Sequence, residues 1–168
     1  MLETVLNAVA AALEKGGLNV FCEFPESLAE FRTKPVVCVG VESCKCLSSG
    51  MGEYLGVKIG KGGEADAQIY GRRLELCLCF EVFSPFGADF GAKACRECSD
   101  KLRQSLSFLP SGIRLIEMES GELRADEEYF AFRQMCRVKC AAYLLAESEG
   151  DEGEFLNFVL KGIVDNGD

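Results

Sequence analysis

The chain has 168 residues, a formal net charge of −9, ten cysteines and no histidine. Because histidine is the usual general base near neutral pH and the commonest metal ligand, this composition excludes Ser-His and Cys-His catalysis and histidine-based metal sites. The acidic balance also argues against a surface that tracks nucleic-acid phosphates, and the length fits one domain with its own hydrophobic core.

The N-terminal segment has apolar residues at helical spacing and a Gly-Gly pair behind them, which predicts an amphipathic helix over residues 2–15. The apolar positions are Leu2, Val5, Leu6, Val9 and Leu13. Glu3 stands where a signal peptide would carry positive charge, and the longest apolar runs are far shorter than the roughly 18 to 20 residues that cross a bilayer. We therefore expect a soluble protein of a reducing cytosol, in which the thiols stay mostly unpaired.

Two strands are expected next. Residues 19–24 form a short strand candidate that ends at Pro25. Residues 36–41 form a β-branched run, Val-Val-Cys-Val-Gly-Val, which is typical of a buried strand.

A Gly-rich region separates these strands from the clearest strand of the chain. Residues 47–71 contain seven glycines around a short apolar alternation at residues 54–59. This pattern predicts a weak strand followed by a mobile loop or a ragged hairpin through residues 61–64, and a loop of this length is usually functional or disordered. Residues 74–83 then alternate apolar residues with mixed ones, as a strand with one core-facing side does.

A second helix and further strands follow. Small and apolar residues at helical spacing predict a helix over residues 89–109, which Pro110 ends. Residues 113–119 are expected to form a strand, residues 120–122 a turn, and residues 123–128 a poor strand or a loop.

The last long segment, residues 129–146, keeps a period of two and is rich in aromatic and β-branched residues, so we interpret it as a strand, although its alanines and leucines also suit a helix. The acidic segment 147–168 follows, with a candidate short helix at residues 155–160. The order of elements predicts an α+β domain over residues 1–146, with two helices packed on one face of a mostly antiparallel sheet.

The cysteines form four close pairs: Cys44 and Cys46, Cys77 and Cys79, Cys95 and Cys98, and Cys136 and Cys140. Four thiolates are enough to coordinate a structural zinc ion, but zinc-binding pairs usually sit on tight turns. Here Cys77 and Cys79 fall on a predicted strand, and Cys95 and Cys98 fall in the apolar stripe of a predicted helix. A redox Cys-x-x-Cys motif needs a helix N-terminus, and Cys95 begins roughly two turns inside its helix. We therefore expect the cysteines to act as small buried apolar residues, with no metal and no cofactor.

Charged residues mark one face of the two long predicted strands. They are Glu75 and Glu81 on the first strand and Arg133, Arg137 and Lys139 on the second. If these strands are neighbours or face a second subunit, opposite charges can pair and fix the register, which makes the five residues candidate contacts between subunits. The alternative is an ordinary solvated sheet face. No catalytic or metal-binding residue is expected.

The order and patterning of elements in residues 1–146 resemble the tail terminator (tail completion) proteins of tailed bacteriophages and their prophages. The similar parts are the opening helix, the strand closing at Pro25, the strand at residues 34–39, the Gly-rich excursion, the strand and helix at residues 73–85 and 91–109, and the strand at residues 129–145. The similarity lies in this pattern of elements, and the chain length also matches the family.

This resemblance implies a small α+β subunit that is not an enzyme and that assembles into a ring, commonly a hexamer, which caps the tail tube and joins it to the head side. The implied partners are further copies of the chain, the tail tube and the head-connector proteins, with no membrane and no sequence-specific nucleic acid. The implied location is the bacterial cytoplasm during assembly and then the tail or neck of the virion. The ten cysteines and the acidic C-terminal segment depart from the family pattern. The alternatives are therefore another prophage neck or minor tail protein, a cytosolic cysteine-based metal or thiol protein, or a small-molecule-binding α+β domain.

Overall fold

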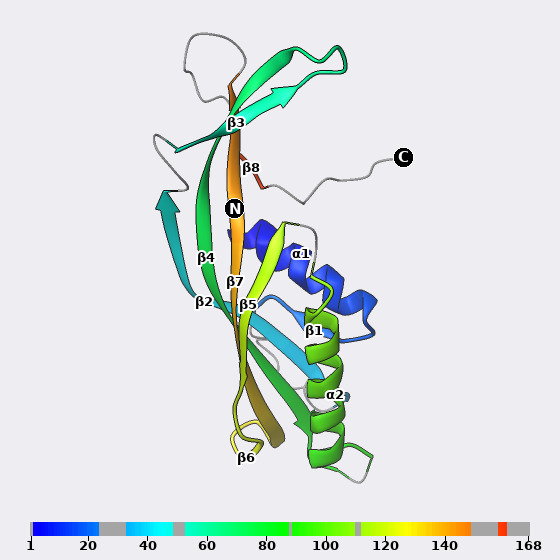
Figure 1. The fold of residues 1–168 in the computed structure, drawn as a ribbon. Coiled ribbons are helices and arrows are strands. Elements are labelled where there is room, and N and C mark those ends of the chain that lie inside the picture. Colours follow the sequence, from blue (N-terminus) through cyan, green and yellow to red (C-terminus); the bar gives the residue numbers. More distant parts are fainter. Residues whose placement is uncertain are drawn as a thin grey trace.

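The computed structural model of the chain describes residues 2–23, 33–48, 53–87, 89–109, 112–148 and 158–160. Its elements are α1 (Leu2–Lys15), β1 (Val20–Phe21), β2 (Val36–Ser48), β3 (Tyr54–Ile59), β4 (Ala65–Pro85), α2 (Gly91–Leu106), β5 (Ile113–Ser120), β6 (Arg124–Asp126), β7 (Ala131–Ser148) and β8 (Phe158–Leu160). Within these residues, both helices lie on one side of an eight-stranded, mostly antiparallel sheet (Figure 1). The predicted α+β class is confirmed.

The strands follow the order β1-β2-β4-β7-β5, while β3 pairs with β4, and β6 and β8 pair with β7. The two central strands, β4 and β7, have 21 and 18 residues and pair from Gln68 opposite Ser148 to Pro85 opposite Ala131. The strand predicted over residues 129–146 is thus confirmed against the competing helix.

Both helices form where their apolar stripes predict them. The buried residues of α1 are Val5, Val9, Ala10 and Leu13. Gly17 follows with a φ of 80°, a left-handed conformation that glycine adopts without a Cβ clash and that commonly ends a helix. Helix α2 is shorter than the predicted 89–109, because it begins at Gly91 and gives way to a turn after Leu106. The predicted stop at Pro110 lies outside the described residues.

The first half of the sheet differs from the prediction in the lengths of its strands. Strand β2 continues to Ser48, beyond the predicted residues 36–41, because it pairs with β4 on both sides of a bulge after Val41. Strand β1 has only two of the predicted residues 19–24 and runs parallel to β2; residue 24 and Pro25 lie outside the described residues. Strands β3 and β4 form a hairpin, which was one of the two forms expected of the Gly-rich region.

The last strands all add to β7. Strand β5 matches the predicted residues 113–119 closely, and β6 occupies part of the predicted poor strand. The short helix predicted at residues 155–160 is wrong for the part that the structure describes, because Phe158–Leu160 form β8 and pair with β7. Residues 149–157 and 161–168 of the acidic segment lie outside the described residues.

The main core lies between the helices and the sheet. Strand β4 buries every second residue from Leu74 to Val82, and β7 buries Cys136, Val138 and Cys140 on the same side. Fully burying one valine or leucine side chain stabilises a fold by about 1.5–3 kcal/mol, so this layer holds the helices in place. The prediction that cysteines fill buried space is confirmed for Cys38, Cys95, Cys98, Cys136 and Cys140, while the other five thiols are exposed or half-buried.

Candidate subunit interface

The five charged residues predicted as subunit contacts all lie on the sheet face that points away from α1 and α2, called the outer face below. Successive side chains of a strand point to opposite faces, and the alternate positions of β4 and β7 are buried under the helices. The condition that the two strands be neighbours is met, since β4 and β7 pair directly. The five residues nevertheless fall into two separate groups.

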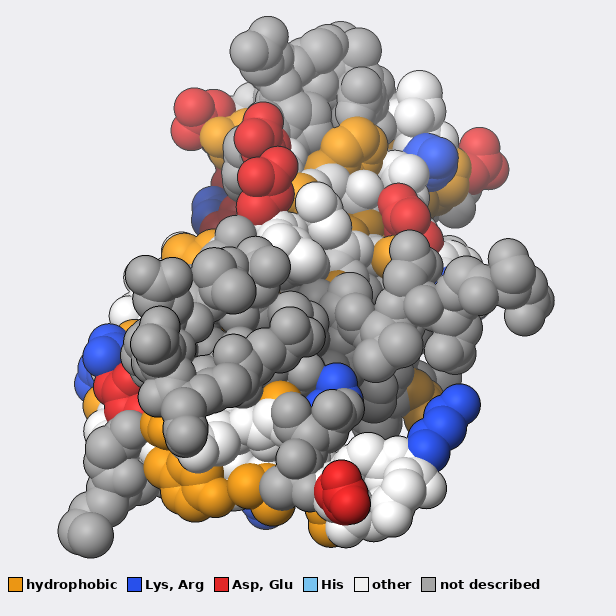
Figure 2. Space-filling model, turned by 90° about the horizontal axis from the view of Figure 1, so that it is seen from above, with side chains coloured by type: hydrophobic (Ala, Val, Ile, Leu, Met, Phe, Trp, Pro, Cys, Tyr) orange, Lys and Arg blue, Asp and Glu red, His pale blue; other side chains and the backbone are white. Residues whose placement is uncertain are grey.

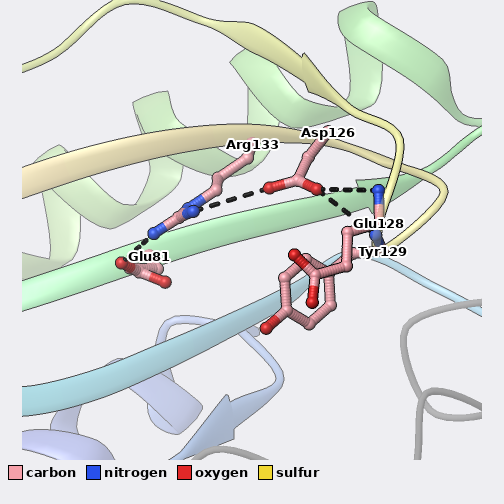
Figure 3. Close-up of polar contacts among 5 residues, drawn as sticks. All are labelled: Glu81, Asp126, Glu128, Tyr129 and Arg133. Atoms are coloured by element: carbon pink, nitrogen blue, oxygen red, sulfur yellow. Dashed lines mark hydrogen bonds and ion pairs between the residues drawn. The ribbon is translucent and has the colours of Figure 1, made fainter.

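The first group is a three-residue network near the end of β4 (Figure 3). The Arg133 guanidinium donates to Glu81 at 2.5 Å and faces the Asp126 carboxylate at 3.5 Å. It also lies over the Phe83 ring, 5.6 Å from the centroid. Burial by itself lowers the pKa of Arg133, but the hydrogen bonds and charges of Glu81 and Asp126 outweigh it and raise that pKa above its usual value.

The network is sheltered from solvent and joins three strands. The side chains of Glu81, Asp126 and Arg133 are only 15%, 19% and 34% exposed. Glu81 lies opposite Met135 and Arg133 opposite Phe83, so the ion pair crosses diagonally between β4 and β7, while Asp126 brings in β6. The pairing expected between the two strands is thus realised at Glu81 and Arg133.

Asp126 also shapes the turn that follows it. One of its carboxylate oxygens accepts hydrogen bonds from the backbone N–H groups of Glu128 and Tyr129, at 3.1 and 3.3 Å (Figure 3). At the far end of the turn, the Phe130 carbonyl accepts a hydrogen bond from the Phe86 N–H at 3.0 Å. The turn is therefore anchored at both ends, and Phe130 within it adopts a φ of 50°.

The second group lies farther along the outer face, where the charges pair mainly with residues outside the predicted set. Arg137 pairs with Glu42 at 3.0 Å, Lys139 with Glu117 at 2.5 Å, and Glu75 with Arg73 of its own strand at 2.9 Å. Within the subunit, Glu75 thus pairs along β4 and not across to β7. These pairs are solvent-exposed, and such pairs typically contribute about 0–1 kcal/mol each.

Apart from Glu117, the residues of these exposed pairs line a shallow groove of about 620 Å³ on the outer face, together with Lys45, Cys77 and Ile116. The Cys77 thiol donates to the Glu42 carboxylate at 3.5 Å. Desolvation, and then this hydrogen bond and the carboxylate charge, raise the pKa of Cys77 above its usual value. The thiol is therefore held in its protonated form, which is neither the nucleophilic nor the metal-binding form.

Four of the buried cysteines have strongly raised pKa values. Burial raises the pKa of both Cys38 and Cys95 to about 12 and that of Cys98 and Cys140 to about 11. Over the residues that the structure describes, no cluster of three or more cysteine, aspartate or glutamate side chains is arranged to hold a metal ion.

Large apolar side chains are exposed at both ends of the sheet. The β3–β4 hairpin exposes Tyr54, Leu55, Val57 and Ile59, and the opposite end of β4 exposes Phe86 and Phe130. Figure 2 shows hydrophobic side chains among acidic and basic ones on the face seen from above. Sequence reasoning missed both surfaces, because exposure of an apolar residue depends on which parts of the sheet the helices cover.

The chain matches no protein-family model and no curated protein. Within the described ranges, neither helix combines the length and apolar character that a membrane span requires. Functional assignment therefore depends on the charged network, the groove and the exposed apolar surfaces described above.

Proposed function

We propose that this chain is a structural subunit of a bacteriophage or prophage tail, of the tail terminator type. Copies of it assemble into a ring that caps the tail tube and joins it to the head side. The subunit acts by binding and not by catalysis.

The observation that carries this proposal is the mismatch between the sheet and its helical layer. Strand β4 has 21 residues and would span roughly 70 Å if fully extended, whereas the 16-residue helix α2 spans roughly 24 Å. The sheet consequently extends past both helices, and the β3–β4 hairpin projects at its end (Figure 1). The sheet is therefore longer than the area that the apolar faces of the two helices can cover.

The projecting part carries the kind of surface that marks protein contacts. Its exposed apolar residues Tyr54, Val57 and Ile59 contribute nothing to the main core. Exposed apolar surface rimmed by polar residues is typical of protein interaction sites. A ring subunit needs two such surfaces, one for each neighbour.

A cysteine-based metal or thiol protein is the alternative from a different class. Thiolate is the reactive and metal-binding form of cysteine, and burial or a nearby carboxylate raises the pKa of the thiols described above. The structure thus favours assembly over thiol chemistry. Elemental analysis of the purified protein tests this point, since stoichiometric zinc or iron would favour the alternative.

Light scattering combined with negative-stain electron microscopy tests the proposal. We expect closed rings with a discrete mass that is a small multiple of the 18.3-kDa subunit, such as six. Isolated tail tubes offered to the protein should be decorated at one end. A strict monomer at every concentration, with or without tubes, would contradict the proposal, and decoration along the tube side would point to another tail component.

A further inference from the structure

We propose that neighbouring copies bind each other through the turn around Phe130 in one copy and the β3–β4 hairpin in the next. This inference rests on the proposed ring assembly and names the contact that builds it. The Phe130 surface consists of Phe130, the adjacent Phe86, and the acidic side chains of Glu127 and Glu128.

The backbone of Phe130 is the first reason. Its φ of 50° lies in the left-handed region, which bulky side chains rarely adopt because the Cβ crowds the backbone. Phe130 is nevertheless 60% exposed, so burial of its own side chain does not offset the strain. Strained residues of this kind persist where the surrounding structure holds them and where function uses them.

The surroundings hold Phe130 firmly. Asp126 fixes the start of the turn through two backbone N–H groups, and Arg133 fixes Asp126 in turn. The Phe86 N–H bonds to the Phe130 carbonyl, and the Phe86 ring packs edge-on against Phe132 with centroids 5.0 Å apart. Two exposed aromatic rings are thus presented on a preorganised support, which lowers the entropic cost of binding. Arg133 and Glu81, predicted as direct subunit contacts, are positioning residues in this arrangement.

The position of the hairpin shows why the partner is a second copy. Strand β4 begins at the hairpin and ends beside Phe86, so the two surfaces lie at opposite ends of the molecule (Figure 1). They cannot meet within one subunit. A contact between two different surfaces of identical copies is heterologous, and repeating it closes a ring or extends a filament.

The chemistry of the two surfaces is complementary. Tyr54, Val57 and Ile59 expose apolar surface that the aromatic rings can cover. Residues 119–130 contain five acids and one base, in a chain with a net charge of −9. On the hairpin, Arg72 and Arg73 are already paired with Glu53 and Glu75, and the turn at residues 60–64 carries one base, Lys61, and one acid, Glu64. Lys61 at the exposed hairpin turn is suitably placed to meet Glu127 or Glu128 of the next copy. Opposite charge across an interface speeds association and selects the orientation.

Two single substitutions and their mixture test the contact. Phe130→Gly removes the ring at a position whose φ suits glycine, and Ile59→Glu places an acid on the hairpin, facing the acidic turn. Phe108→Gly is the matched control, because Phe108 is 82% exposed beyond the end of α2 and belongs to neither surface. Circular dichroism and thermal unfolding establish that each variant is folded.

We expect the wild-type chain and Phe108→Gly to associate alike, and each of the other two variants to associate at least tenfold more weakly by light scattering. A mixture of Phe130→Gly and Ile59→Glu retains one productive contact, between the Phe130 surface of the second and the hairpin of the first. It should therefore form heterodimers and nothing larger.

The remaining outcomes separate the contact from the ring. A discrete wild-type oligomer that survives both substitutions, or a mixture that stays monomeric, would overturn the contact and leave the ring standing. Open-ended growth that both substitutions abolish would support the contact and contradict the closed ring. A wild-type monomer at all concentrations would overturn both.

Discussion

Replacing Arg133 with methionine should test whether the Arg133 network organises this end of the sheet. The substitution keeps most of the side-chain volume and removes the charge that faces Glu81 and Asp126. One oxygen of Glu81 bonds to Arg133, and its other oxygen, Oε2, is buried without a hydrogen-bond partner among the described residues. In the variant, the sheltered Glu81 carboxylate therefore loses both the positive charge and the hydrogen bond of Arg133.

The size of the effect follows from the exposure of the partners. Breaking a fully buried ion pair costs about 3–5 kcal/mol, and breaking a fully exposed pair costs about 0–1 kcal/mol. Because these side chains are 15–34% exposed, we expect the free energy of unfolding to fall by about 2 kcal/mol. For a domain of this size, that loss lowers the melting temperature by roughly 4–8 °C.

Urea unfolding at a protein concentration too low for self-association measures the loss. Arg124→Met is the matched control, because Arg124 pairs with Glu122 and both side chains are about 80% exposed, so the expected loss is below about 0.5 kcal/mol. Adding Glu81→Gln to Arg133→Met should recover part of the stability. Equal losses for the two arginine variants, or no coupling between Arg133 and Glu81, would refute the reasoning.

Two further predictions concern the interior of the sheet. A Cβ at Gly71 would lie 2.5 Å from the Leu144 carbonyl oxygen, so Gly71→Ala should destabilise the protein by about 1–3 kcal/mol, as overpacking typically does. A Cβ at Gly40 meets open space, so Gly40→Ala is the control and should cause no such loss; equal melting temperatures for the two variants would contradict this. Burial raises the pKa of Cys95 from 9.0 to about 12, so the folded state keeps a proton that the unfolded state loses. The free energy of unfolding should therefore fall as pH rises from about 9 to about 12, and it should fall less steeply in Cys95→Ala. Urea midpoints measured across this pH range test the prediction, and parallel curves for the two proteins would refute it.

Local patterning was sufficient to identify most elements. The apolar stripe of residues 2–15 and the alternation of residues 74–83 predict helix and strand directly, because helical and strand periodicities place side chains on faces. The same alternation placed Arg133 and Glu81 on one face of the sheet. These predictions depend only on neighbours in sequence, and the structure agrees with them.

Strand lengths were beyond such reasoning. Residues 65–73 include Gly71 and lack a clear strand pattern, yet they belong to β4 because β3 and β7 supply hydrogen-bonding partners on both sides. Strand β2 likewise continues past its β-branched run because a bulge after Val41 restores its pairing with β4. Strand propensity is a weak guide where pairing with distant segments decides the outcome.

The sequence by itself determined the fold class and the face on which each charged residue of the long strands lies. Only the tertiary structure decided which charges meet: Arg133 pairs with Glu81 from 52 positions away, and Arg137 with Glu42 from 95 positions away. It also decided that Phe130 takes a strained, exposed conformation, since Asp126 of β6, Arg133 of β7 and Phe86 just after β4 anchor that turn. The physical reason is that periodicity acts over a few residues, whereas ion pairing and exposure depend on how distant strands are brought together.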